Sequence, residues 1–301
     1  MNNLGNFKHI KLEQDDSAAI LTLHRPEKMN AFTDRMAKEI IEALDVTDDN
    51  DDIRAVIFTG SGDRAFCAGA DLSQGDKTFD HRKRDDLSEA QKTDLSKLRR
   101  DTGGLVTLRI FDSLKPVIGA INGAAVGVGA TMQLAMDIRI ASDGARFGFV
   151  FNRRGINPEA ASSWFLPRLV GIQQALEWCF TGRVFPADEA LKAGLIHSIQ
   201  PQKEVLETAK TMAAEIASNT AAVSTTLTRH MMWRMLGASH PMEAHIVDSA
   251  SIFSRGQTED AREGVMSFLE KRKPVYPIKV SDGMPAHFPW WENPDFTWIG
   301  E

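Results

Sequence analysis

The sequence has few cysteines and no long apolar run. No stretch approaches the ~20 apolar residues that a helix needs to cross a bilayer, and residues 1–11 lack the apolar centre of a signal peptide. The 301 residues include only two cysteines, Cys67 and Cys179, far apart in the chain. One possible bridge is no disulfide scaffold, which favours a reducing compartment. We therefore expect a cytoplasmic protein with no membrane partner.

A basic surface is also missing. Lys and Arg number 35 against 41 Asp and Glu, a net charge of −6. The densest basic stretch, residues 81–84, is followed at once by Asp85 and Asp86, which is typical of a solvated face. A mildly acidic chain of this kind argues against a nucleic-acid partner.

Several enzyme signatures do not occur. Gly127-x-Gly129 lacks the third glycine or alanine of a dinucleotide site, because that place is Met132. There is no Gly-Lys-Ser/Thr phosphate loop and no Gly-x-Ser-x-Gly nucleophile turn. The histidines show no metal-ligand spacing. We expect no metal and no bound cofactor.

What is present is material for a large core, since 43% of the residues are hydrophobic. The length suggests one large domain, or one domain with an appendage. Short β-branched apolar runs alternate with helical patterns, which predicts an α/β fold with helical crossovers. The predicted strands are residues 18–23, 53–59, 116–121 and 138–141, and the predicted helices between them are residues 34–44, 104–114 and 130–136.

Composition divides the chain further. Residues 1–205 read as the α/β core, 206–273 as a helical region and 274–301 as a tail rich in proline and tryptophan. The tail is too aromatic for a disordered segment, so we expect it to pack on the body or on a neighbouring subunit. Residues 73–102 are highly polar, with a possible helix near 87–98, and look like a gate.

Two glycine-bearing turns, residues 65–72 and 121–130, carry the predicted chemistry. Glycine lets the backbone approach a ligand and leaves N–H groups pointing outward. Two such groups from different loops can bind a developing oxyanion, and losing one such donor typically raises a barrier by ~3 kcal/mol. Either turn alone is better explained as an ordinary tight turn. Cys67, in the first turn, has no sequence-local base and is interpreted as a packed side chain.

Together with two other segments, these turns resemble the crotonase (enoyl-CoA hydratase/isomerase) superfamily. The segments come in the order that the family has and cover the chain to about Pro274. They are His24-Arg25-Pro26-Glu27-Lys28-Met29-Asn30-Ala31-Phe32, Phe66-Cys67-Ala68-Gly69-Ala70-Asp71-Leu72, Lys115-Pro116-Val117-Ile118-Gly119-Ala120-Ile121-Asn122-Gly123 with the glycine turn after it, and Glu259-Asp260-Ala261-Arg262-Glu263-Gly264.

The resemblance implies a spiral of ββα units, a helical C-terminal trimerisation region, and a homotrimer or dimer of trimers. The substrate would be an acyl-CoA thioester, with CoA as part of the substrate. The backbone N–H groups of Ala70 and Val128 would form the oxyanion hole. The expected substrate-binding residues are Lys28, Ala68, Gly69, Asp71, Gly127, Phe268 and Lys271, the last two often supplied by the next subunit in such enzymes.

The chain departs from the family's hydratases, which use two glutamates around a water. The matching positions hold Thr131 and Phe151, and neither side chain can exchange protons near neutral pH. We interpret Phe151 as a wall of the acyl pocket and Thr131 as a hydrogen-bonding group for water or substrate.

One carboxylate remains. Residues 155–163 resemble the stretch of peroxisomal-type Δ3,Δ2-enoyl-CoA isomerases in which a glutamate at the place of Glu159 is the catalytic base. The same residue is also explained as an acid at a helix N-terminus after a proline. The leading hypothesis is an enoyl-CoA isomerase using Glu159. The alternatives are an enoyl-CoA hydratase or another crotonase-type lyase or hydrolase, and a non-catalytic acyl-CoA-binding paralogue.

Overall fold

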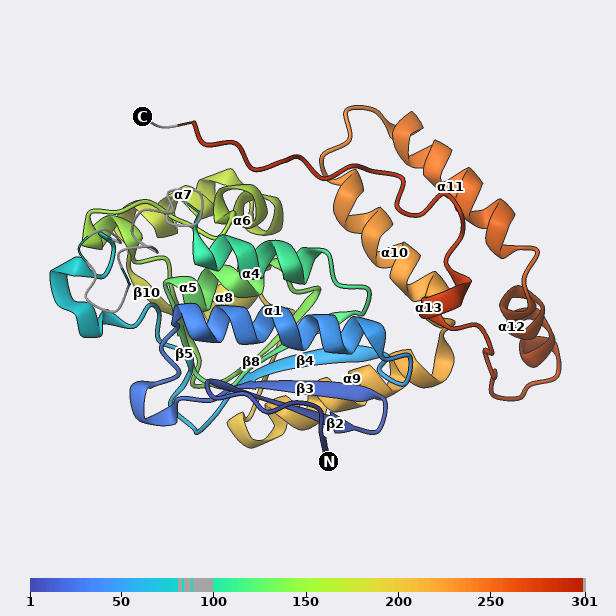
Figure 1. Ribbon diagram of the computed structural model, residues 1–301, viewed down its shortest axis with the longest axis horizontal. Coiled ribbons are helices and arrows are strands. Elements are labelled where there is room, and N and C mark those ends of the chain that lie inside the picture. The colour runs from blue at the N-terminus through green and yellow to red at the C-terminus, as the bar shows by residue number, and fades with distance from the viewer. Residues whose placement is uncertain (81–82, 84–87, 89–99, 300–301) are drawn as a thin grey trace.

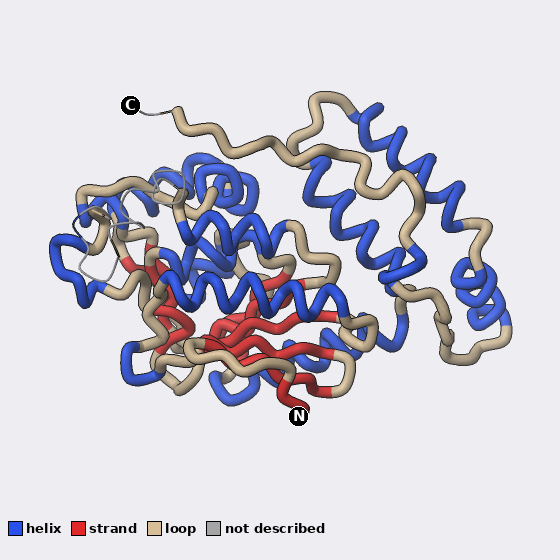
Figure 2. The backbone as a smooth tube through the Cα atoms, viewed as in Figure 1, coloured by secondary structure: helices blue, strands red, loops and turns tan. Residues whose placement is uncertain are grey.

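The computed structural model describes residues 1–80, 83, 88 and 100–299. The helix expected near residues 87–98 lies outside them. An α/β body carries a C-terminal helical arm that extends away from it (Figure 1). Figure 2 shows the strands gathered in one region of the body, with helices covering them. None of the described helices is both long and apolar enough to cross a bilayer.

A seven-stranded sheet forms the base of the body. Its order is β1-β2-β3-β4-β6-β8-β11. The strands from β3 to β11 run parallel, while β1, β2 and β3 pair antiparallel. All four predicted strands form, as β3, β4, β6 and β8. The bounds are β1 Asn2–Asn3, β2 Ile10–Asp15, β3 Ala18–Leu23, β4 Ala55–Gly60, β6 Val117–Ile121, β8 Ile138–Ser142 and β11 Ser198–Gln200.

Both faces of this sheet are covered, which is why its central strands are apolar throughout. Side chains of β4 alternate between the faces. Val56 and Phe58 join the large cluster with α1 and α4, whereas Ala55 and Ile57 pack against α9. This packing holds the strands in place and thereby fixes the positions at which the loops at their ends begin.

A second, four-stranded sheet has the order β10-β9-β7-β5. The prediction of a continuous turn over residues 121–130 is wrong in part, because β7 lies inside it. The strand consists of three small residues and forms by pairing with β5 and β9. The amino-acid pattern of such a short segment does not indicate a strand. The bounds are β5 Ala65–Cys67, β7 Ala124–Val126, β9 Arg146–Gly148 and β10 Val184–Pro186.

Helices connect the strands and form the C-terminal arm. The first predicted helix forms as α1, for which the sequence offers Thr33 or Asp34 as the cap, and the structure has Thr33 there, its side chain accepting the Met36 N–H. The α-helices are α1 Asp34–Asp49, α4 Thr102–Phe111, α5 Val128–Thr131, α6 Ser162–Val170, α7 Ile172–Thr181, α8 Ala187–Lys192, α9 Val205–Asn219, α10 Ala222–Met235, α11 Pro241–Arg255, α12 Glu259–Leu269 and α13 Val280–Gly283. The 3-10 helices are η1 Pro26–Lys28, η2 Leu72–Lys77, η4 Met132–Ala135, η5 Phe151–Arg154 and η6 Gln202–Glu204.

The tail packs on its own chain, against α10 and, through Phe296 and Arg100, against the body, which is one of the two outcomes predicted. The Trp291 ring stacks on His230 of α10, with centroids 4.9 Å apart. The Arg234 guanidinium lies 3.5 Å from the centre of the Trp291 ring. From there the tail runs back across the body, toward α6 and α7 (Figure 1).

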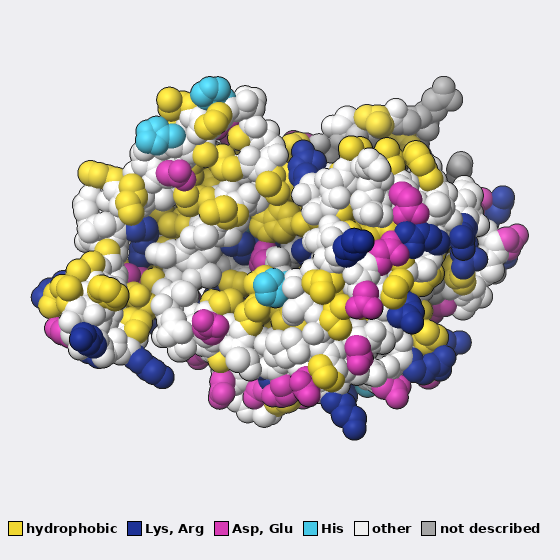
Figure 3. Space-filling model, turned by 180° about the vertical axis from the view of Figure 1, so that it is seen from behind, with side chains coloured by type: hydrophobic (Ala, Val, Ile, Leu, Met, Phe, Trp, Pro, Cys, Tyr) yellow, Lys and Arg dark blue, Asp and Glu magenta, His cyan; other side chains and the backbone are white. Residues whose placement is uncertain are grey.

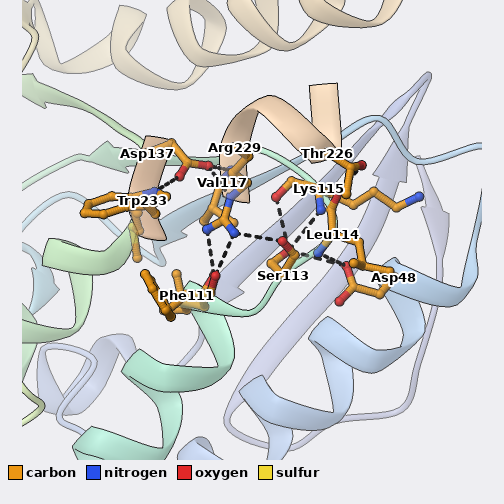
Figure 4. A network of polar contacts seen from close by, with 12 residues as sticks. Asp48, Phe111, Ser113, Leu114, Lys115, Val117, Asp137, Thr226, Arg229 and Trp233 are labelled. Carbon is orange, nitrogen blue, oxygen red and sulfur yellow. Dashed lines mark hydrogen bonds and ion pairs between the residues drawn. The ribbon is translucent and has the colours of Figure 1, made fainter. Parts of the chain in front are cut away.

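A buried arginine on α10 ties this helix to the body (Figure 4). The Arg229 side chain is 4% exposed and pairs with Asp137 at 2.8 Å. It also donates to the carbonyl oxygens of Ile110, Phe111 and Ser113 at 2.7–2.8 Å. Ile110 and Phe111 are the last two residues of α4, and Ser113 lies just beyond its end, where carbonyl groups lack a following helical turn.

Arg229→Ala is expected to lower the free energy of unfolding by ~3–5 kcal/mol, because it removes the cation paired with Asp137 and leaves the Phe111 and Ser113 carbonyls without their guanidinium donor. Urea unfolding measures the loss. Arg272→Ala serves as the matched control: its ion pair with Glu263 is 43% exposed on the arginine side, so the loss should stay below ~1 kcal/mol. Equal effects of the two substitutions would contradict this account of the Arg229 network.

Candidate active site

The two predicted turns meet at a cavity of about 860 Å³. The first turn lies beside Phe32, which bridges Ala70 in parallel fashion. Phe32 donates to the Gly69 carbonyl at 2.8 Å, and Asp71 donates back to the Phe32 carbonyl at 2.9 Å. The Gly69 carbonyl and the Asp71 N–H are therefore both paired with Phe32. The N–H of Ala70, which lies between them in the chain, donates no hydrogen bond within the described residues.

The second turn presents another N–H group. Gly127 has φ +56° and precedes α5, so the Val128 N–H is the first of that helix and has no helical acceptor. A Cβ built on Gly127 would lie 3.7 Å from the Gly69 Cα, so the two turns are in contact. A Cβ on Gly129 would lie 2.1 Å from the Cys67 carbonyl oxygen, which explains why only glycine fits there. Ala70 and Val128 therefore present N–H groups to one cavity from two touching loops.

Cys67 supports the first turn from inside. It is fully buried, and burial raises the pKa of its thiol to about 12. A thiol in this state is no nucleophile near neutral pH. The interpretation of Cys67 as a packed side chain is confirmed.

Glu159 lines the same cavity. The Thr131 hydroxyl donates to its Oε1 at 2.5 Å. Burial, followed by the neighbouring charge of Asp101, raises the pKa of the Glu159 carboxyl group to about 8. The group is therefore poised to give or take a proton in the neutral to mildly alkaline range.

The backbone explains why Glu159 points into the cavity. Ala160 and Ala161 both have left-handed conformations, with φ +58° and +51°. The helix α6 begins only at Ser162, and no side chain caps it. The alternative reading of Glu159 as an acid at a helix N-terminus is thus not what the structure shows. A strained bend before the helix turns its side chain away from α6 and toward the α5 loop.

The structure brings most of the predicted site residues together. Thr131 lies directly behind Glu159, fully buried. Its hydroxyl is occupied by the carboxyl group and does not line the cavity. Phe151 forms part of the wall, as predicted. The predicted residues that line the cavity are Ala68, Gly69, Ala70, Asp71, Gly127, Val128, Phe151 and Glu159.

Three predicted CoA contacts lie apart from the cavity of this chain. Lys28 is exposed on η1. Phe268 is 81% exposed and Lys271 follows it just beyond α12. Figure 1 shows α12 at the opposite end of the molecule from the α5 loop. Within one chain, Phe268 and Lys271 are therefore far from the carboxyl group of Glu159.

Sequence reasoning missed several residues that line the cavity. Asp101 and Gly103 come from the start of α4, and Trp298 comes from the tail. The Asp-Thr-Gly-Gly order at residues 101–104 is a recognisable helix start, but it lay in a segment interpreted as polar and gate-like. The aromatic tail was expected to pack, but nothing in its sequence indicated that Trp298 would line this cavity. Among the described residues, no group of three or more His, Cys, Asp or Glu side chains is placed to hold a metal ion.

Known proteins similar to this chain are enoyl-CoA hydratases and isomerases. The Enoyl-CoA hydratase/isomerase family model matches residues 13–279. Enoyl-CoA hydratase ACTT3 of Alternaria alternata is 41% identical over 262 residues, covering 87% of this chain and 83% of that protein. The 1,2-epoxyphenylacetyl-CoA isomerase of Escherichia coli (strain K12) is 33% identical over 262 residues, covering 85% and 93%. The chain belongs to the enoyl-CoA hydratase/isomerase family.

Solved structures agree with this membership. A probable enoyl-CoA hydratase/isomerase from Mycobacterium abscessus has a TM-score of 0.79 at 32% identity, covering 89% of this chain and 98% of that chain. The α/β fold of crotonase type is confirmed. The family model ends at residue 279, so most of the tail, including Trp298, lies outside it.

Proposed function

We propose that this chain shifts a double bond in an enoyl-CoA thioester, with Glu159 as the acid/base group and the N–H groups of Ala70 and Val128 as the oxyanion hole. The observation that carries the proposal is the arrangement of Glu159 in the cavity. It is a carboxyl group whose pKa is raised to about 8, and it shares a cavity with two N–H groups that have no acceptor among the described residues.

The chemistry follows from this arrangement. The thioester oxygen accepts hydrogen bonds from Ala70 and Val128, which draws charge onto that oxygen. Glu159 takes a proton from C2, and the dienolate is held by the two N–H groups. The protonated Glu159 then returns the proton at C4, so that the double bond moves into conjugation with the thioester. The reaction moves one proton from C2 to C4 and needs no cofactor.

Phe151 and Thr131 support migration over water addition. Phe151 places an apolar ring at a hydratase carboxylate position, and it is 5% exposed. Thr131 is engaged with Glu159 and does not line the cavity. Hydration remains the second candidate because ACTT3 and other relatives are named hydratases. In that case a water beside Glu159 would add to a 2-enoyl thioester.

The apolar arm supports an oligomer, a homotrimer or a dimer of trimers. Large apolar side chains cover α11 and α12, seen as yellow patches on the helical part in Figure 3. A surface of this kind is typical of a subunit interface. We propose that Phe268 and Lys271 reach the CoA of a neighbouring subunit, since they are remote from the cavity of their own chain. The most exposed of these side chains are Ile246, Ile252, Phe253, Phe268 and Leu269.

Product analysis tests the proposed reaction. The native protein is incubated separately with a medium-chain 3-enoyl-CoA and with the matching 2-enoyl-CoA. The products are separated by chromatography, and their masses are measured by mass spectrometry. We expect the 3-enoyl thioester to yield the conjugated isomer of equal mass. A product that has gained water from the 2-enoyl thioester, with no migration, would favour hydration. Binding without any turnover would favour the acyl-CoA-binding paralogue.

A further inference from the structure

Asp101 connects the start of α4 with the stretch that carries Glu159. As the residue before α4, it accepts N–H hydrogen bonds from Gly103 and Gly104, both at 2.9 Å. Its Oδ2 also accepts the Ala160 N–H at 2.6 Å. The first two contacts cap the helix. The third reaches across 59 positions to the residue directly after Glu159.

The contact with Ala160 acts where the backbone is strained. Two successive non-glycine residues in left-handed conformation cost on the order of 1–3 kcal/mol each, and they persist only when neighbours hold them. Asp101 is such a neighbour, because it binds the N–H of Ala160, the first residue of this bend. The direction in which Glu159 leaves the backbone therefore depends on Asp101.

The start of α4 also fits closely around the Glu159 carboxyl group. A Cβ built on Gly103 would lie 2.1 Å from Glu159 Oε2 and 3.1 Å from the Val128 side chain. The glycine thus allows the carboxyl group to lie against the helix backbone, between Asp101 and the second oxyanion loop. Oε1 is held from the other side by Thr131.

Asp101 is the charged group that acts on the Glu159 proton. After burial, its negative charge is the largest cause raising the pKa of Glu159. The hydrogen bond from Thr131 lowers the pKa of Glu159. Within the described residues, no cation forms an ion pair with Glu159. The other titratable or charged side chains lining the cavity are His9, Asp34, Arg35, Asp71, Asp80, Arg100 and Arg154.

We propose that Asp101 is a positioning residue that aims the Glu159 carboxyl group into the cavity and keeps a proton on it when the site is empty. The inference rests on the proposed role of Glu159 as the acid/base group and names Asp101 as the residue that sets its orientation and protonation. Three N–H groups donate to the Asp101 carboxylate, and its negative charge disfavours ionisation of the neighbouring Glu159. Glu159 is thus the member of the pair that holds the proton.

The test replaces Asp101 in the full-length protein in two ways. Asp101→Asn removes the charge at nearly the same size. Asp101→Ser keeps an oxygen that can cap α4 but is too short to contact Ala160. The titration of Glu159 is followed by infrared spectroscopy of the carboxyl band in the protein without substrate, with the band identified by its loss in Glu159→Gln.

The Glu159 midpoint is expected to fall by roughly one pH unit or more in both Asp101 variants, because a neighbouring negative charge is gone. The rising limb of kcat/KM against pH should move by the same amount. Thr258→Ala is the matched control. It removes the N-cap of α12, which accepts from Ala261, and should leave the midpoint in place.

The two readouts separate this inference from the proposed function. A midpoint that moves in both variants supports the role of Asp101 even if no thioester is turned over, and the proposed function is then what fails. A midpoint that stays at the native value in both variants overturns the inference, whatever their activity, and leaves Asp101 as a helix cap only.

Discussion

Glu159→Gln should lower kcat/KM for double-bond migration by two or more orders of magnitude, the usual effect of removing an acid/base group. The amide preserves the size of the side chain and can still accept from Thr131, but it cannot carry a proton. In the native protein, kcat/KM should rise with pH and level off above about 8, because the reaction begins with the ionised form of Glu159. The variant should lack this rise.

Stability measurements separate this loss from unfolding. The folded-state pKa of Glu159, about 8, is above its ordinary value of 4.5. A carboxyl group whose folded-state pKa is raised stabilises the fold below its unfolded pKa. This stabilisation is lost as the pH rises from 4.5 through 8. Glu159→Gln should therefore unfold in urea at pH 8 no more easily than the native chain. A variant that is folded and fully active would remove Glu159 from the mechanism.

Val128→Pro should reduce kcat about 10²–10³-fold, the range found when one oxyanion donor is removed. The substitution deletes a single backbone N–H. Val128 is the first residue of α5, and proline is well accommodated at a first helical position because no intrahelical bond is lost. The thioester should still bind, so the loss is expected mainly in kcat.

Val128→Ala is the control for the side chain. It keeps the N–H and removes only the methyl groups that lie near Gly103. We expect it to retain most of the activity. If the alanine variant were as impaired as the proline variant, packing between the loop and α4 would account for the effect, and the N–H of Val128 would not be an oxyanion donor.

The elements that could be predicted from sequence are those with a local pattern. Strands β3, β4, β6 and β8 are runs of apolar residues covered on both faces, and Thr33 is a recognisable helix cap. The glycine turns were found because a close approach of two backbones excludes a side chain, as at Gly129.

The rest depends on contacts between distant segments. Strand β7 is too short to show a period and exists through its neighbours β5 and β9. Asp101 looks like any helix cap until the fold brings Ala160 to it. The raised pKa of Glu159 needs burial as well as Asp101, and neither can be read from residues 155–163 alone. Trp298 lines the cavity at the end of a tail whose Trp291 packs on α10 and whose Phe296 ring contacts Arg100.

One labelling experiment tests the central claim, that a single carboxyl group moves the proton from C2 to C4. A 3-enoyl-CoA carrying deuterium at C2 is converted in ordinary water, and the conjugated product is examined by NMR and mass spectrometry. The account predicts deuterium at C4 of the product with the native protein and almost no conversion with Glu159→Gln. Conversion that leaves no deuterium at C4, or a product that contains added water, would contradict it.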